Sequence, residues 1–217
     1  MFARHDMLLL DAAAVDYARA AAISLNPTIS EVHIEQVVHA SIPAIVKRQE
    51  RVSPGLIAVG FSSHLYHKGV RLRVQSVIPL DGIRAHISPF DAISFSHRPG
   101  PVRDALEALL HLAEATDVDV GLYGSAALEA ITKLPYMTAQ SDIDICVRRR
   151  GGADLRVFHR ATIALAEAYG VRFDIEALCT DGAGVKLAEL LSAQKTILCK
   201  GLYGPELRPA TCHTLPF

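Results

Sequence analysis

Residues 118–147 read VDVGLYGSAALEAITKLPYMTAQSDIDICV, and the rest of the sequence is most simply interpreted outward from them. An apolar run ends in the pair Gly124-Ser125, and a helix-like segment and a loop follow it. Asp142 and Asp144 then stand two residues apart in a strongly β-forming context, where side chains at i and i+2 lie on the same face of a strand. Two neighbouring carboxylates repel each other, so this pattern favours a divalent cation bound between them.

A third acid lies in residues 171–178 (VRFDIEAL), which are also strand-like. Asp174 and Glu176 share a face there, and either could join Asp142 and Asp144 if the two strands are neighbours. Three carboxylates can hold two Mg²⁺ ions, which prefer oxygen ligands. Two such ions can stabilise the attacking and leaving oxygens of a phosphoryl displacement, so the pattern indicates phosphoryl-transfer chemistry.

The Gly124-Ser125 turn fits the same chemistry. A glycine between a strand and a helix lets a phosphate approach the backbone, and the helix N-terminus offers unpaired N–H groups to an anion. Each feature also has a structural interpretation: the Gly-Ser pair as a helix N-cap, the Asp-x-Asp pair as a solvated strand edge, and Glu176 as a solvent-facing side chain. Only their joint occurrence indicates a site.

Composition excludes several classes of protein. The formal net charge of −1 argues against nucleic-acid binding through a general excess of positive charge. The apolar runs are too short for a signal peptide or a membrane span, and we expect a cytoplasmic protein. The four cysteines have no C-x-x-C spacing and are predicted to be buried, reduced thiols. No histidine pair has the spacing of a zinc site.

Residues 1–97 are predicted to form a smaller, mainly β, accessory or substrate-binding domain. Asp11 is a candidate N-cap for a helix over residues 12–22. Turn signals separate the apolar runs, which suggests an antiparallel sheet. The expected strands are residues 7–10, 42–48, 56–61, 70–78 and 83–87.

Residues 98–217 are predicted to form the catalytic domain, so the fold class is α+β with a mixed sheet and flanking helices. Pro101 suits a helix start, and Gly170 suits a helix end. Helices are expected from Pro101 and over 126–133, 153–169 and 185–191, and strands over 118–122, 142–147, 171–178 and 196–199. Residues 148–152 are expected to form a basic turn.

The order Gly-Ser, Asp-x-Asp, apolar-Asp-apolar resembles the DNA-polymerase-β-like nucleotidyltransferase superfamily. Within it, the chain resembles the phosphoribosyl-dephospho-CoA transferase family, the malonate decarboxylase holo-acyl-carrier-protein synthases, although it lacks that family's tryptophans. The resemblance rests on segments at both ends of the chain: RHD (4–6), PAIVKR (43–48), GLYGS (121–125), SDID (141–144), FDI (173–175) and GAGVKLAE (182–189).

The resemblance implies a reaction between triphosphoribosyl-dephospho-CoA and the apo acyl carrier protein subunit of malonate decarboxylase. A carrier serine would attack the α-phosphorus and release pyrophosphate, with no role for nucleic acid or membrane. The implied catalytic residues and Mg²⁺ ligands are Asp142, Asp144 and Asp174, and the implied substrate-binding residues are Gly124, Ser125, Lys47 and Arg48.

Other interpretations stay open at this point. Lys47 and Arg48 could equally belong to a solvated edge strand. The basic residues 148–150 could dock an acidic carrier protein or form a solvated turn. The chain could also be a nucleotidyltransferase for a small molecule or another protein hydroxyl, or a nucleotide-binding module without catalysis.

Overall fold

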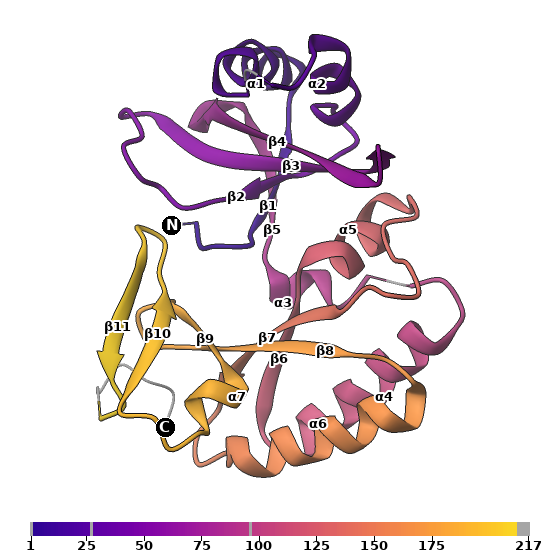
Figure 1. Ribbon diagram of the computed structural model, residues 1–217, viewed down its shortest axis with the longest axis vertical. Coiled ribbons are helices and arrows are strands. Elements are labelled where there is room, and N and C mark those ends of the chain that lie inside the picture. The colour runs from indigo at the N-terminus through magenta and orange to yellow at the C-terminus, as the bar shows by residue number, and fades with distance from the viewer. Residues whose placement is uncertain (1, 27, 96, 212–217) are drawn as a thin grey trace. The chain divides into compact units, whose positions relative to one another are not determined.

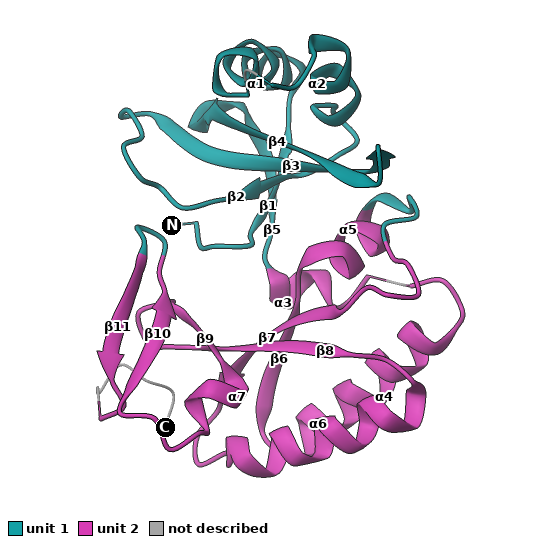
Figure 2. Ribbon diagram, in the orientation of Figure 1, with its two compact units in different colours: residues 1–88, 132–136, 202–204 teal, residues 89–131, 137–201, 205–217 magenta. Residues whose placement is uncertain are grey.

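The computed structural model describes residues 2–26, 28–95 and 97–211, which divide into two compact units (Figures 1 and 2). Unit 1 comprises residues 1–88, 132–136 and 202–204, and unit 2 comprises residues 89–131, 137–201 and 205–217. Both contain helices and a β-sheet, so the α+β class is confirmed. In the described residues, no helix is long and apolar enough to cross a membrane.

The sheet of unit 1 is antiparallel, with strand order β4-β3-β2-β1-β5. All five predicted strands are present, but β2 is shorter than expected and β3 extends further. Their bounds are β1 Met7–Leu10, β2 Ala44–Val46, β3 Leu56–His67, β4 Val70–Pro79 and, after the short 3-10 helix Leu80–Gly82, β5 Ile83–Ile87.

Helices α1 (Ala12–Leu25) and α2 (Glu31–Val37) pack against this sheet (Figure 1). The predicted helix and its cap are confirmed, since the Asp11 carboxylate accepts a hydrogen bond from Ala14 N at 2.8 Å. Helix α2 was not predicted, because seven residues are too few to display a helical period. Its signal is Ser30, an N-cap residue that accepts from His33 N.

Asn26 joins the end of α1 to the edge strand β4. Its side-chain amide donates to Ala22 O at 2.7 Å and to Gln75 O at 2.8 Å, and its Oδ1 accepts from Gln75 N at 3.2 Å. Because Asn26 is buried, these bonds satisfy groups that water cannot reach.

The sheet of unit 2 is mixed, as predicted, with strand order β11-β10-β9-β8-β7-β6. Strands β7 and β8 are parallel, and the other neighbours in the sheet are antiparallel. The bounds are β6 Val118–Leu122, β7 Ile143–Arg149, β8 Phe173–Leu178, β9 Gly184–Lys186, β10 Thr196–Lys200 and β11 Pro205–Pro209.

Parallel neighbours require a crossover connection, and α6 supplies it between β7 and β8. Helices α4 and α6 lie side by side along one face of the sheet, and α3 and α5 lie on the other (Figure 1). Gly170 ends α6 in the left-handed conformation, as expected. The bounds are α3 Pro89–Ala92, α4 Pro101–Ala115, α5 Gly124–Thr132, α6 Leu155–Tyr169 and α7 Leu187–Leu190.

Two expectations for unit 2 are wrong in part, and one strand was not predicted. The predicted helix 185–191 begins as strand β9, because 184–186 pair with β8, and only α7 is helical. Strand β11 was not predicted, since its five residues carry Pro at both ends and two charges between them. Residues 148–152 are not all turn, since β7 continues to Arg149.

The cysteine prediction is confirmed for the described residues. Cys146, Cys179 and Cys199 are buried and not linked by disulfides. Cys212 lies outside the described residues.

Asn26→Ala should lower the free energy of unfolding of unit 1 by about 2–3 kcal/mol, because buried groups of α1 and β4 lose their partners. Native-state hydrogen exchange of the β4 amides in increasing urea would measure the effect. Ser24→Ala, in the same helix but exposed, is the control and should change it by less than about 0.5 kcal/mol. Equal effects of the two substitutions would contradict this account of Asn26.

Candidate functional site

Two of the predicted acids face each other across neighbouring strands. The parallel register of β7 and β8 pairs Asp144 with Asp174, and both side chains are partly exposed. Neighbouring strands lie about 4.8 Å apart, so the two carboxylates leave the same face of the sheet close together. The alternate residues, Ile143 and Ile145, are fully buried on the opposite face.

Gly124 packs directly against Asp144. The backbone N–H of Tyr123 donates to Asp144 O at 3.0 Å, which fixes the turn after β6 beside β7. A Cβ atom on Gly124 would lie only 2.0 Å from Asp144 Oδ2, and Gly124 has a φ of +66°. Both the space and the backbone therefore require glycine. Ser125 follows in the first turn of α5 and is partly exposed.

The environment of Asp144 raises the proton affinity of its carboxylate. Burial, together with the nearby charges of Asp174 and Asp142, raises the pKa of Asp144 to about 6, although Lys186 opposes this shift. The ionised form of Asp144 is therefore disfavoured in the folded chain, and such perturbed carboxylates are frequent in functional sites.

Asp142 lies just before β7, and more than half of its side chain is exposed. The guanidinium Nε of Arg172 donates to Asp142 Oδ1 at 2.5 Å, and Arg172 also donates to Gln140 O. Asp142 thus stands at the rim of the site, held by a cation from just before β8.

Two lysines complete the charge pattern, and sequence reasoning missed both. Lys186 Nζ bonds Asp174 Oδ1, and Lys200 Nζ bonds Glu176 Oε1 at 2.6 Å. Lys186 was assigned to a helix, so its position opposite Glu176 in the register of β8 and β9 was not visible in the sequence. The only signal in the sequence is weak: two acidic residues, Asp174 and Glu176, on one face of a strand favour cationic side chains on the neighbouring strands.

Glu176 differs from the solvent-facing interpretation, because only 3% of it is exposed. Its buried charge is compensated by Lys200, as burial requires. Tyr123, also buried, lies near Glu176 and Asp144; burial, and then these two charges, hold the pKa of its hydroxyl well above the ordinary value. Glu176 is therefore a structural neighbour of the exposed acids.

The fit of Mg²⁺ to this site rests on the chemistry of its donors. In the described residues, no three His, Cys, Asp or Glu side chains are arranged to hold a metal by themselves. Asp144 and Asp174 nevertheless offer adjacent hard oxygen ligands that repel each other. Mg²⁺ typically binds one or two carboxylates together with substrate phosphates and water, so this pair suits it.

Lys47 and Arg48 belong to unit 1, whereas the acids belong to unit 2. Both side chains are exposed, directly after β2. Lys47 Nζ donates to Gln75 Oε1 at 3.0 Å, and burial of its stem lowers the pKa of Lys47.

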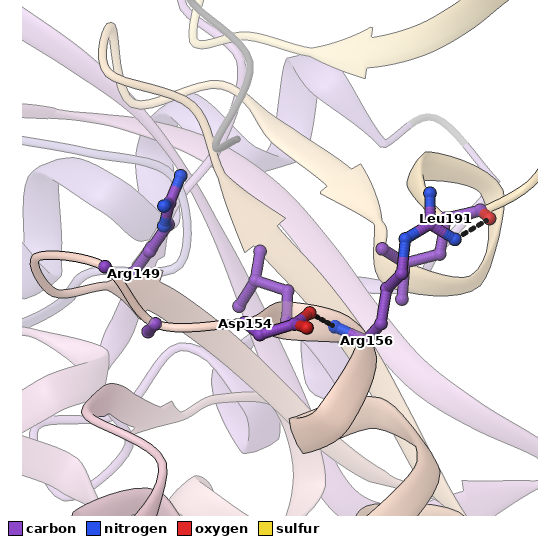
Figure 3. Close-up of a pocket in the computed structure, with 7 residues that line it drawn as sticks. Arg149, Asp154, Arg156 and Leu191 are labelled. Atoms are coloured by element: carbon purple, nitrogen blue, oxygen red, sulfur yellow. Dashed lines mark hydrogen bonds between the residues drawn. The ribbon is translucent and has the colours of Figure 1, made fainter.

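The arginines at 148–150 have three different environments. Arg148 lies over the ring of Phe90 at 4.5 Å from the ring centre, and Arg150 pairs with Asp119. Arg149 lines a pocket of about 220 Å³ at the start of α6, with Arg156 on the other side of Asp154 (Figure 3). Here the Asp154 carboxylate accepts from the backbone N–H of Arg156, whose guanidinium donates to Leu191 O.

Two protein-family models match the chain. The model of the phosphoribosyl-dephospho-CoA transferase MdcG N-terminal domain matches residues 3–89, and that of the MdcG C-terminal domain matches residues 90–211.

Curated relatives carry the same description. A phosphoribosyl-dephospho-CoA transferase of Xanthomonas axonopodis pv. citri is 29% identical over 81% of this chain and 83% of its own length. One from Bradyrhizobium diazoefficiens is 32% identical, but over only 45% of this chain and 43% of its own length. One from Pseudomonas putida is 25% identical over 78% of this chain and 80% of its own length. No solved structure matches the chain significantly.

Asp144→Asn should stabilise the folded chain at neutral pH, in Mg²⁺-free buffer, by about 1–2 kcal/mol. The pKa of Asp144 in the folded chain, about 6, lies above the ordinary value of 3.8. The free energy of unfolding of the wild-type chain therefore falls as the pH rises from 3.8 to 6, because the folded state binds the proton more tightly than the unfolded state does. The difference between variant and wild type should therefore be full above pH 6 and vanish below pH 3.8, as measured by urea denaturation across this range.

Asp142→Asn is the matched control, because Asp142 is more than half exposed. We expect it to change the free energy of unfolding by less than about 0.5 kcal/mol. A loss of stability in Asp144→Asn at pH 7 would show that the charge of Asp144 is not under strain.

Proposed function

The chain belongs to the phosphoribosyl-dephospho-CoA transferase family, and on that premise we propose that it modifies an acyl carrier protein. The donor would be triphosphoribosyl-dephospho-CoA, and the acceptor a serine hydroxyl of the apo carrier subunit of malonate decarboxylase. The observation that carries the proposal is the pairing of Asp144 with Asp174 beside Gly124, which concentrates carboxylates where a polyphosphate could approach a helix N-terminus.

We assign unit 2 to the nucleotidyltransferase fold on three observations. Its sheet is mixed, its Gly-Ser pair opens α5, and its acids lie on neighbouring parallel strands. The enzyme would then be a nucleotidyltransferase in which positioning and charge neutralisation provide most of the catalysis.

Mg²⁺ would be held by Asp144 and Asp174, with Asp142 as the third ligand. When bound, it would neutralise charge on the triphosphate and on the leaving pyrophosphate. Lys186 and Arg172, which now bond Asp174 and Asp142, would be close enough to the site to contact phosphate oxygens once the carboxylates had other partners.

The chain's own groups then have defined tasks. The Oγ of the carrier's serine forms a bond to the α-phosphorus as the bond between this phosphorus and pyrophosphate breaks. Asp174 of this chain accepts the proton of the serine hydroxyl. Gly124 and the first turn of α5 bind β- and γ-phosphate oxygens through backbone N–H groups, and the Ser125 hydroxyl adds a donor. Lys47 and Arg48 of unit 1 bind other substrate phosphates.

For the carrier, we propose the basic surface at the end of β7 and the start of α6. Arg149 and Arg156 line one pocket there, and an acidic carrier would complement their charge. Arg148 and Arg150 are already engaged by Phe90 and Asp119.

The transfer reaction itself tests the proposal. Incubation with apo carrier protein, triphosphoribosyl-dephospho-CoA and Mg²⁺ should increase the carrier's mass by one prosthetic group, as read by intact-protein mass spectrometry. Asp142→Asn, Asp144→Asn and Asp174→Asn should each reduce the rate by about 10³-fold, because the lost charges act on the transition state. Glu176→Gln should reduce it less than about 10-fold.

Absence of a mass shift with folded wild-type protein would refute the proposed reaction. Turnover of ATP without carrier would instead favour a nucleotidyltransferase with another acceptor. A severe Glu176→Gln defect beside an active Asp174→Asn variant would show that the wrong acid of β8 has been assigned.

Gly124→Ala should lower the transfer rate by about 10²-fold or more, because its Cβ would displace the Asp144 carboxylate. Steady-state kinetics would measure the loss, and circular dichroism would check folding. Gly170→Ala is the control, since Gly170 has nearly the same left-handed φ, +64°, but a Cβ there meets no atom within 4 Å. If Gly124→Ala transfers as fast as the control variant, the close approach between residue 124 and the Asp144 carboxylate does not matter for activity, and this account is wrong.

A further inference from the structure

A pocket of about 660 Å³ opens on unit 1, and the acids of unit 2 do not line it. Its lining includes four cationic side chains, Arg4, Lys47, Arg48 and Arg51, and one carboxylate, Glu50. Neither the sequence nor the proposed reaction gives a role to Arg4 or Arg51. The pocket has the volume of a typical small-molecule site and an excess of positive charge, so an anionic ligand suits it.

The sheet register brings two lining residues of the pocket into one row. Ile45 on β2 and Gln75 on β4 lie on either side of Gly60, which belongs to β3. Gly60 leaves room for the stem of Lys47, since a Cβ on Gly60 would lie 3.2 Å from Lys47 Cδ. The ammonium group of Lys47 then reaches Gln75 Oε1. Because this amide is neutral, the charge of Lys47 is not cancelled by its partner.

The groups around the pocket are held in place by further hydrogen bonds. Gln75 Nε2 donates to Leu25 O at 2.8 Å, which fixes the amide that orients Lys47. The Gln49 side chain bonds both Lys47 O and the backbone of Ala58, so the segment carrying Lys47 and Arg48 is tied to β3. A preformed cationic site loses less entropy on binding than a flexible one.

The arginines on either side of Glu50 remain available to a ligand. Arg48 and Arg51 are exposed, and neither forms an ion pair within the described part of the chain. Arginine matches phosphate oxygens in a bidentate manner, and lysine binds them as a point charge. Apolar side chains also line the pocket, including Ile45, Val52 and Val77. A ligand with a phosphate anhydride and a long, partly apolar arm satisfies both kinds of surface.

We infer that the unit 1 pocket binds the diphosphate and pantetheine arm of the dephospho-CoA donor. The identity of the ligand rests on the proposed function, whereas the anion site rests on the pocket's own side chains. Arg48 and Arg51 contact the diphosphate together with Lys47, and the apolar lining contacts the arm. The pocket then selects a CoA-derived donor over an ordinary nucleoside triphosphate.

Binding of dephospho-CoA, which lacks the triphosphoribosyl group, tests this directly. Isothermal titration calorimetry on the full chain should show that Arg48→Glu and Arg51→Glu each raise Kd about ten-fold or more, because a charge-assisted contact is replaced by repulsion. Arg84→Glu is the matched control: Arg84 is exposed on β5 of the same unit and does not line the pocket, so Kd should change less than two-fold.

Two further readouts separate this inference from the reaction. Asp144→Asn should bind dephospho-CoA as wild type does, although it loses transfer. Arg51→Glu should raise KM for the donor with kcat nearly unchanged, as expected when ground-state and transition-state binding weaken equally. If the wild-type chain binds dephospho-CoA through Arg51 but has no transferase activity, the assignment of the pocket stands and the proposed function is refuted.

Three outcomes would overturn the inference. The Kd for dephospho-CoA could be unchanged in Arg48→Glu and Arg51→Glu, it could rise equally in Arg84→Glu, or pyrophosphate could bind as tightly as dephospho-CoA. The last would show an anion site without a role for the arm. Circular dichroism of each variant confirms that the exposed substitutions leave the fold intact.

Discussion

The parallel pairing of β7 and β8 sets two carboxylates side by side, and much of unit 2 can be understood from that constraint. A shift of one residue in either strand would move its acids into the core and its apolar side chains out. Ile143, Ile145 and Ile175 are buried on the opposite face, so hydrophobic burial holds the register despite the repulsion. The free energy for bringing Asp144 next to Asp174 therefore comes from packing on the far side of the sheet.

Cations from three other segments reduce that repulsion. Arg172, just before β8, pairs with Asp142, Lys186 on β9 pairs with Asp174, and Lys200 on β10 pairs with Glu176. Asp144 is left with Gly124 against its carboxylate, and burial together with the neighbouring acids raises its pKa. The more exposed pairs of Asp142 and Asp174 can exchange partners with a ligand more easily than the buried pair of Glu176.

The two units present opposite charges to a ligand. Unit 1 offers a cationic pocket on an antiparallel sheet, and unit 2 offers carboxylates that suit a divalent cation. A donor with a diphosphate arm and a triphosphate contains a group for each.

The sequence by itself determined the α+β class, most elements, the glycine turn and the three candidate acids, because alternation and turn chemistry are local properties of the chain. Local patterns could not settle 185–191, whose apolar residues suit a strand and a helix equally, or α2 and β11, which are too short to show a period. Only the tertiary structure decided which cation meets which acid, that Glu176 is buried, and that Lys47 lies over Gly60. These depend on strand register and on neighbours distant in the chain, and hydrophobic packing fixes both at once.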